Sequence, residues 1–457
     1  MSFAFVDNSD INTRARRLIR SHVMKGKNSA CGTGSALMKN EAPVATLGYP
    51  DCMGSFLALT RQVANDPSLI SSTRGISPQT MLQLRHFSAY ILDSISPREF
   101  CQPTGVIEWM WFQLTFYNEA YFHCTIAVAS ACAAFLTGDS SHSPVALYHM
   151  SQAYRLINQK LSSDEALSDV SIAVVAAINV YDRLYGDPQR AMIHLNGVTR
   201  MVALRGGVRE LAKRSFIIAE KVFRSDIELA FHCGSKPRFP SEDVPRHLIL
   251  VNSMLRLEPR SHQEAGLIES VMYQSVCADL REVVLDVLHF SRTFNQANYA
   301  HKLDPEAYQS TLVYIGYRLL ETDPSHQDSE INTNLDILAR LAMIGFLSTF
   351  CFGIGRKLLP FPLLAEQFGS VARTICEGNR TQKLVIFWAL IMGRISALAA
   401  SDDLWLAQKL KGLANELELH AWPEVSNALR IFPWVEASHE AQGEKFWNSM
   451  FTQPVPL

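Results

Sequence analysis

The sequence predicts an all-α protein, and three features of the chain support this. Apolar residues recur with the 3.6-residue period of helices through most of the chain, whereas strict alternation of apolar and polar residues is almost absent. Hydrophobic residues make up 48% of the 457 residues and charged residues 19%, a ratio that favours helices buried on several sides. Clusters of Pro, Gly, Ser and Asp separate the apolar segments. We therefore expect a large fold of many helices packed in antiparallel pairs.

The chain is predicted to consist of an N-terminal arm and one large helical domain. Residues 1–75, here called the basic arm, are polar and rich in Gly and Ser, and they are expected to be mostly irregular apart from a basic helix near 10–24. The helical domain is expected over residues 76–457. A looser stretch divides it into two halves, at about 76–240 and 262–450.

Periodic segments with capping signals define the expected helices in chain order. They are predicted at 77–94, 107–137, 144–161, 164–185, 188–205, 208–233, 262–294, 305–322, 331–351, 361–377, 381–400, 402–418 and 422–431. No period of 33–47 residues recurs, which argues against a solenoid of helical repeats.

The turn between the helices at 164–185 and 188–205 carries the clearest local signals. Ser162 and Glu165 have the spacing of a capping box before an apolar segment. Gly186 is expected to end the first helix in a left-handed conformation, and Pro188 to occupy the first position of the next. Because the turn is so short, it predicts a closely packed antiparallel pair with a structural role.

Two apolar stretches, at 120–136 and 384–400, resemble membrane spans in length. The first continues a helix that contains Glu119, and the second carries Arg394 near its middle. An arginine buried in lipid costs roughly 2.5–3.5 kcal/mol or more. We therefore expect both stretches to be core helices of a protein that has no membrane partner.

The cysteines favour a reducing compartment. The nine cysteines are an odd number, are scattered singly, and in several cases lie inside apolar segments where free thiols pack as small hydrophobes. The start of the sequence does not have the pattern of a signal peptide. The cytosol or the nucleus is the expected location.

The sequence predicts no catalytic, cofactor-binding or metal-binding residues. Close ligand pairs such as Cys-x-x-Cys do not occur, and the neighbours His123 and Cys124 are expected to pack in the core. The glycine-rich stretch 353–357 lacks the third glycine of a dinucleotide fingerprint and is expected to end a helix. Ser140 and His142 lie close together, but no strand, turn and helix frame them as in a hydrolase. We expect no cofactor and no enzymatic activity.

One helix leaves an alternative open. Aromatic residues are dense within 107–137: Trp109, Trp111, Phe112, Phe116, Tyr117, Tyr121 and Phe122. Ligand cavities are mostly apolar, so these side chains fit a helical enzyme or ligand carrier with an apolar pocket near 107–137. Core packing is the preferred interpretation.

The basic arm carries the one charged feature of interest. Six cations lie within 14 residues that contain no acid: Arg14, Arg16, Arg17, Arg20, Lys25 and Lys27. Such a cluster fits contact with DNA phosphates or a nuclear import signal. The alternative is a solvated surface helix anchored by Leu18, Ile19 and Val23.

Several segments, taken in order, resemble the helical regulatory domain of the fungus-specific transcription factors. The clearest is 148–211, with its alanine-rich central helix, its Tyr-Gly-Asp turn, "HLNGVTRMV" and "RGG". The segment 223–240 is similar to the end of the first half of that domain. The stretches 384–397, 401–410 and 421–447 are similar to its C-terminal half, and the start of the chain resembles that of family members without a zinc cluster.

The resemblance implies a nuclear transcription regulator that acts through protein contacts. The expected partners are other transcription factors or a second copy of the chain, together with a small-molecule effector. Family members often accompany metabolic or natural-product genes, which makes such a gene set the expected target. The six-cysteine DNA-binding cluster of many members cannot be carried over, because Cys31 and Cys52 stand alone upstream of the domain. DNA contact through the basic arm is therefore expected to be weak and non-specific.

Overall fold

In the computed structural model, the described residues are 77–78, 80–84, 87, 96–102, 114–139, 143–245, 270–297, 302–322, 330–351, 353–354, 357–375, 378–399 and 404–452. They all belong to one compact unit that spans residues 66–457. Most of them are helical, and the sheet found among them has two strands of two residues each. The all-α prediction is confirmed for this part of the chain. The predicted domain boundaries remain predictions.

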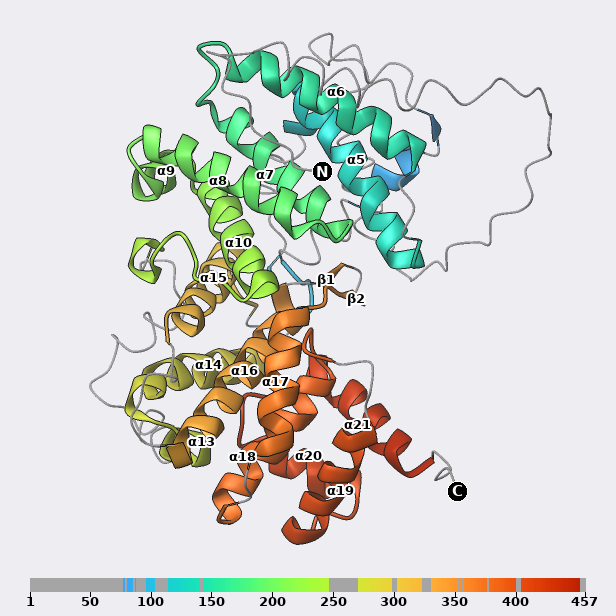
Figure 1. Ribbon diagram of the computed structural model, residues 1–457, viewed down its shortest axis with the longest axis vertical. Helices are drawn as coiled ribbons and strands as arrows, with labels where there is room; N and C mark the ends of the chain where they lie inside the picture. Colours follow the sequence, from blue (N-terminus) through green and yellow to red (C-terminus); the bar gives the residue numbers. More distant parts are fainter. Residues whose placement is uncertain are drawn as a thin grey trace, which may run out of the picture. The chain divides into compact units, whose positions relative to one another are not determined.

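The first half of the described unit is built from helices that pack in pairs (Figure 1). They are α5 (Glu119–Thr137), α6 (Pro144–Leu161), α7 (Asp169–Leu184), α8 (Pro188–Leu204), α9 (Val208–Arg214) and α10 (Phe216–Cys233). The helix α5 packs along α6, and α7 packs along α8. The helix α10 contacts both α7 and α8, so it joins the second pair to the rest of the fold.

The turn between α7 and α8 has the predicted construction. Gly186 adopts a left-handed conformation with φ of 69°. The side chain of Asp187 accepts a hydrogen bond from the backbone N–H of Arg190, and Pro188 is the first residue of α8. These details confirm the prediction of a sharp reversal, in which the glycine tolerates a backbone angle that other residues avoid.

Three predicted helix boundaries in this half are wrong, for local reasons. Ser162 ends α6, and the capping residue of α7 is Ser168, whose side chain accepts from the backbone N–H of Ser171. The predicted helix at 208–233 breaks at Ser215 into α9 and α10. The predicted helix at 107–137 is interrupted at Asn118, whose side chain caps α5. Ser and Asn side chains bond to nearby backbone groups and so compete with helix continuation.

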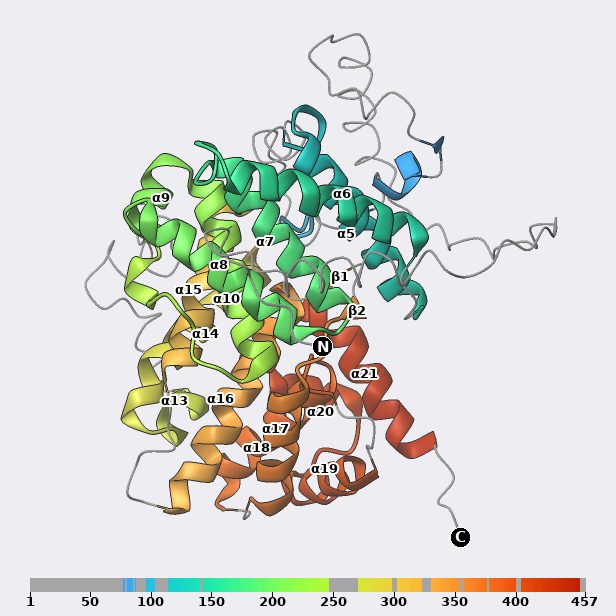
Figure 2. The same cartoon turned by 45° about the horizontal axis from the view of Figure 1, so that its top comes forward.

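The second half is also helical. Its elements are the 3-10 turn η2 (Ser241–Asp243), α13 (Val271–Ser275), α14 (Ala278–Gln296), α15 (Pro305–Glu321), α16 (Glu330–Cys351), α17 (Pro362–Thr374), α18 (Arg380–Arg394), α19 (Leu404–Leu417), α20 (Trp422–Leu429) and α21 (Glu436–Thr452). The helix α16 packs against α17 and α18, and α15 packs against α10, α14 and α16 (Figure 2). The predicted helix at 262–294 is interrupted at Val276 and Cys277, between α13 and α14.

Two short extended segments complete the fold. The strands β1 (Gly353–Ile354) and β2 (Lys357–Leu358) form an antiparallel hairpin directly after α16, where the sequence predicts only a helix end. Residues 96–102 run beside the start of α15, where Cys101 and Leu303 form a parallel bridge. The backbone N–H of Gln102 donates to the Leu303 carbonyl oxygen at 2.9 Å, which fixes this segment over the start of the helix.

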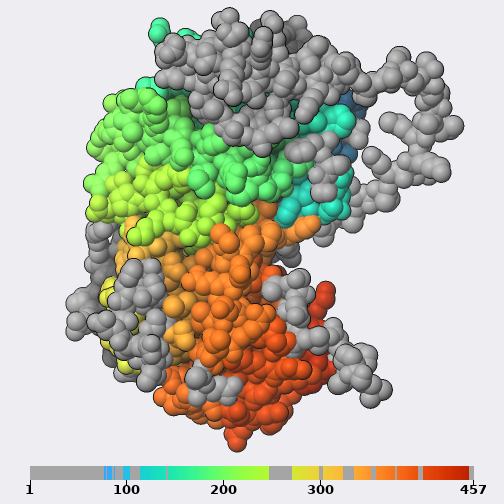
Figure 3. All heavy atoms as spheres, in the orientation of Figure 1, coloured from blue at the N-terminus to red at the C-terminus, as the bar shows by residue number. Residues whose placement is uncertain are grey.

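Among the described residues, one large hydrophobic core runs through both halves, from Phe100 to Met450, and a small second cluster contains Leu84, Phe122, Ile126 and Ala129. On the face shown in Figure 3, the green atoms of the first half meet the orange atoms of the second half along a continuous boundary. The two stretches that resemble membrane spans lie mainly in α5 and α18, whose side chains are largely buried in this core. Among the described residues, α5 is long and apolar enough to cross a membrane, but 72% of the relevant window is buried inside the fold.

The C-terminal helix α21 was not predicted. Its sequence, EASHEAQGEKFWNSMFT, is polar on most of its surface. His439, Trp447 and Met450 are buried against the core. The backbone N–H of Val435 donates to His439 Nδ1 at 3.0 Å, and His439 Nε2 lies 2.9 Å from Thr349 Oγ1 on α16. A buried neutral histidine therefore attaches α21 to α16.

Candidate functional site

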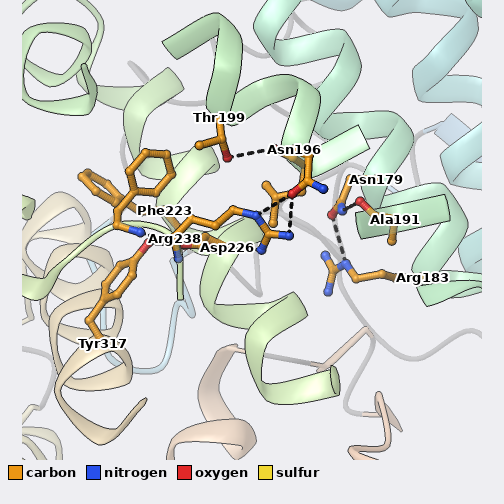
Figure 4. Close-up of polar contacts among 11 residues, drawn as sticks. Asn179, Arg183, Ala191, Asn196, Thr199, Phe223, Asp226, Arg238 and Tyr317 are labelled. Atoms are coloured by element: carbon orange, nitrogen blue, oxygen red, sulfur yellow. Dashed lines mark hydrogen bonds and ion pairs between the residues drawn. The ribbon is translucent and has the colours of Figure 1, made fainter. Parts of the chain in front are cut away.

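The described residues place a group of buried charges where α7, α8, α10 and α15 meet. Asp226 on α10 lies at its centre and is fully buried. Its Oδ2 accepts from the backbone N–H of Arg238 at 2.8 Å, from that of Phe239 at 3.1 Å and from Tyr317 Oη at 3.0 Å (Figure 4). Its Oδ1 accepts from Arg238 Nη1 at 3.3 Å. Burial raises the pKa of the Asp226 carboxyl, while these donors stabilise its charged form.

The partners of Asp226 come from separate parts of the chain. Arg238 lies in the segment that follows α10, and its guanidinium also donates to Asn196 Oδ1 on α8, from Nε at 3.0 Å and from Nη2 at 2.9 Å. Tyr317 lies on α15 and is fully buried. The Phe223 ring packs edge-on against the rings of Phe239 and Tyr317, with centroids 5.9 Å away in each case. One carboxylate therefore joins α8, α10 and the segment after it to α15.

A second buried carboxylate, Glu228, lies two residues further along α10. Glu228 binds Arg183 of α7 through one oxygen, and its other oxygen accepts from Arg224 Nε at 2.8 Å. Burial raises the pKa of Glu228, but the two guanidinium groups outweigh this effect and hold the pKa below its usual value. Removing one partner of such a buried pair leaves an uncompensated charge, which costs about 3–5 kcal/mol.

Hydrogen bonds extend this group into the α7–α8 pair. Arg183 Nε donates to Asn179 Oδ1 at 3.2 Å, and Asn179 Nδ2 donates to the Ala191 carbonyl oxygen at 2.7 Å (Figure 4). Asp182 Oδ2 lies 2.7 Å from His194 Nδ1. Buried polar groups that are this fully paired rigidify a core and specify one arrangement of it.

The arrangement fits structural coupling better than catalysis. Asp226 and Glu228 already accept hydrogen bonds from groups that hold helices together. Near Asp182, the Cys124 thiol is buried and its pKa is raised to about 12, so it is not an activated nucleophile. Within the ranges that the structure describes, no three His, Cys, Asp or Glu side chains converge as metal ligands.

Most residues singled out from the sequence lie elsewhere. The six cations Arg14, Arg16, Arg17, Arg20, Lys25 and Lys27 fall outside the described residues, as do Ser140, His142, Trp109, Trp111 and Phe112. Of the other aromatic residues, Phe116, Tyr121 and Phe122 are buried in the core, and Tyr117 is partly buried. His123 and Cys124 are also buried, and His123 Nδ1 lies 2.8 Å from His149 Nδ1 on α6.

Sequence reasoning missed the group around Asp226. The available signal is the acids Asp226 and Glu228 among the apolar residues of the helix FIIAEKVFRSDIELAFHC. An acid in a buried helix predicts a partner, since unpaired buried charges are costly. It does not identify the partner, because Tyr317 lies 91 residues further along the chain.

Comparison with known families explains where this group lies. The model of the fungal specific transcription factor domain matches residues 82–331, more than half of the chain. The chain belongs to this family. No curated protein and no solved structure matches it significantly. The match confirms the resemblance over 82–331, and the resemblance of the segments after 331 remains a prediction. The fungal specific transcription factor domain contains the whole group, from Asn179 to Tyr317.

Proposed function

We propose that this protein regulates transcription from the nucleus through protein contacts made by its helical domain. Membership of the fungal specific transcription factor domain family carries the proposal, since it implies a transcription regulator. The contacts of Asp226 support the proposal that the helical domain carries the regulatory function. They join α8, α10 and α15 into one connected unit, which supports a function of the helical domain as a whole.

A tethered reporter assay tests this function. The full chain is fused to an unrelated DNA-binding domain whose site lies upstream of a reporter gene. We expect reporter transcription to change several-fold relative to the DNA-binding domain alone. An Asp226→Leu fusion should lose the effect, because four donors lose their acceptor and the helical domain is destabilised. An Asp164→Asn fusion, altered at an exposed carboxylate, is the matched control. An unchanged reporter with a folded, nuclear wild-type fusion would contradict the proposal.

We further propose that the basic arm supplies weak, non-specific DNA contact and nuclear import. Its six cations, listed above, are the support, since phosphate contact needs clustered Lys and Arg but no particular base sequence. The dissociation constant is expected at about 10⁻⁴–10⁻⁶ M at physiological salt, weakening steeply as salt increases. Replacing all six cations with Gln should abolish this binding and reduce nuclear accumulation. Titration against promoter and scrambled duplexes at two salt concentrations measures it. Nanomolar preference for one duplex would contradict the proposal.

The proposal also includes a small-molecule effector and a set of target genes. We propose a small-molecule effector that binds the helical domain and a metabolic or natural-product gene set as the target. The support is the family to which the chain belongs. Thermal shift against a panel of metabolites tests the effector, because a ligand that binds the folded state raises the melting temperature. Transcript profiling tests the gene set.

A further inference from the structure

Two buried carboxyl groups lie on helices that pack against α15. Glu220 lies on α10 and Asp286 on α14, and each has 7% of its surface exposed. Within the described part of the chain, Glu220 Oε1 and Asp286 Oδ2 have no hydrogen-bond partner. Both helices pack against α15. A buried carboxylate oxygen without a donor is unfavourable, and protonation of the carboxyl relieves the cost.

Glu220 lies among charges of both signs on α10 and α15. Burial is the largest effect and raises its pKa to about 7. Arg224 and Lys221, both on α10, lower the pKa, whereas Glu228 on α10 and Glu306 on α15 raise it. Arg224 also donates to Glu228 and to Gln309 on α15, at 2.8 Å and 3.3 Å, so its charge is shared among several acceptors.

Asp286 on α14 has a similar environment. Burial is again the largest effect and raises the pKa of Asp286 to about 7. Arg318 lowers this pKa, and Glu282 raises it further. Arg318 Nη1 lies 3.9 Å from Asp286 Oδ2, beyond hydrogen-bond distance. The same nitrogen donates to Tyr314 Oη at 2.9 Å. The guanidinium on α15 therefore forms a long ion pair with Asp286 but donates no hydrogen bond to Asp286 Oδ2.

We propose that α15 is a pH-sensitive element of the helical core, held more tightly when Glu220 and Asp286 are protonated than when they are ionised. Ionisation leaves a buried charge on each of the two helices, α10 and α14, that pack against α15. Because α15 carries the Tyr317–Asp226 and Gln309–Arg224 links, its loosening weakens the connection between the two halves. If the proposed regulatory function holds, this makes the regulator responsive to intracellular pH.

The sign and size of the effect follow from the two states of each carboxyl. In the unfolded chain both are ionised well below pH 6, whereas in the folded chain they titrate near pH 7. The protonated folded form is therefore favoured at pH 6, and this advantage is lost as the pH rises towards 8. For a folded pKa of about 7, the equilibrium for opening α15 shifts about tenfold per carboxyl between pH 6 and pH 8.

Histidines act in the opposite direction, so global stability alone does not report the effect. Burial lowers the pKa values of His123, His149 and His439, which makes the folded protein more stable as the pH rises through the ordinary range of histidine. A comparison between matched variants cancels this background, because all variants share the same histidines.

Hydrogen exchange of the full chain, measured at pH 6 and pH 8 and corrected for intrinsic rates, tests the proposal. Glu220→Gln and Asp286→Asn mimic the protonated forms, and Glu366→Gln changes an exposed carboxylate of α17 as a control. We expect protection of α15 amides in the wild type and in Glu366→Gln to fall, relative to the double variant, by about tenfold per carboxyl between pH 6 and pH 8. Equal pH dependence in wild type and double variant would overturn the proposal.

Infrared spectroscopy of the wild type provides a second measurement that needs no variant to fold. A protonated buried carboxyl has a carbonyl stretch distinct from that of a carboxylate. The proposal requires this band to be present at pH 6 and to fall to about a tenth of that intensity by pH 8, and its absence at pH 6 would overturn the proposal. A negative result in the hydrogen-exchange or the infrared experiment would contradict the pH response but would not change the outcome of the reporter assay. The pH response and the regulatory function are therefore tested separately.

Discussion

Removing the hydroxyl of Tyr317 tests the link between α15 and the first half. Tyr317 Oη donates to Asp226 Oδ2 at 3.0 Å, and both side chains are fully buried. A hydrogen bond to a charged group contributes about 1.5–3 kcal/mol, and phenylalanine keeps the ring that packs against Phe223. We therefore expect Tyr317→Phe to lower the free energy of unfolding by about 1.5–3 kcal/mol.

Urea unfolding followed by circular dichroism measures this change, with the free energy extrapolated linearly to water. Tyr148→Phe is the matched control, because Tyr148 is 58% exposed and its change should stay within about 0.5 kcal/mol. A double-mutant cycle with Asp226→Asn isolates the pair, and a coupling of about 0.5–3 kcal/mol is expected. If Tyr317→Phe behaves like Tyr148→Phe, the hydroxyl does not hold α15 and the description of the group around Asp226 is wrong.

Three further predictions concern the turn, the C-terminal helix and metal content. Gly186→Val should destabilise the protein by roughly 1–2 kcal/mol through its left-handed backbone alone, since an added Cβ meets nothing within 4 Å; an unchanged melting temperature would show that the turn relaxes freely. Burial lowers the pKa of His439 to about 3, so below about pH 6.5 the wild type should lose up to about 1.4 kcal/mol more stability per pH unit than His439→Gln, in which the other buried histidines are unchanged. Equal acid sensitivity of the two proteins in urea titrations would refute that assignment. Elemental analysis should find well under one zinc per chain, and one chelator-resistant zinc would reveal a ligand set that the sequence and the described residues do not show.

Much of the fold follows from local sequence signals. The prediction of the turn between α7 and α8 is confirmed in detail, because Gly186 and Pro188 each have one strongly preferred role in such a turn. The break at Ser215 was missed because the apolar spacing continues across it and only the backbone of one residue departs from the helix. The helix α21 was missed because few of its side chains are apolar, and its attachment depends on the buried His439.

The candidate site shows what local patterns leave undetermined. The acids of α10 were visible in the sequence, but the choice of partners depends on tertiary packing. Arg238 reaches Asp226 only because the chain turns back after α10, and Tyr317 reaches it only because α15 packs against that helix. Neither pairing has a spacing that periodicity can reveal. The raised pKa values of Glu220 and Asp286 likewise arise from burial in the assembled core.

Transcript profiling of cells that lack this protein tests the central claim most directly. Transcripts are compared among cells that lack the gene, cells complemented with the wild-type chain, and cells complemented with Asp226→Leu at matched expression. The regulatory account predicts that a defined set of transcripts changes on deletion, returns to its original level with the wild-type chain, and does not return with the variant. A transcriptome unchanged by deletion under conditions in which the protein is expressed would contradict the account.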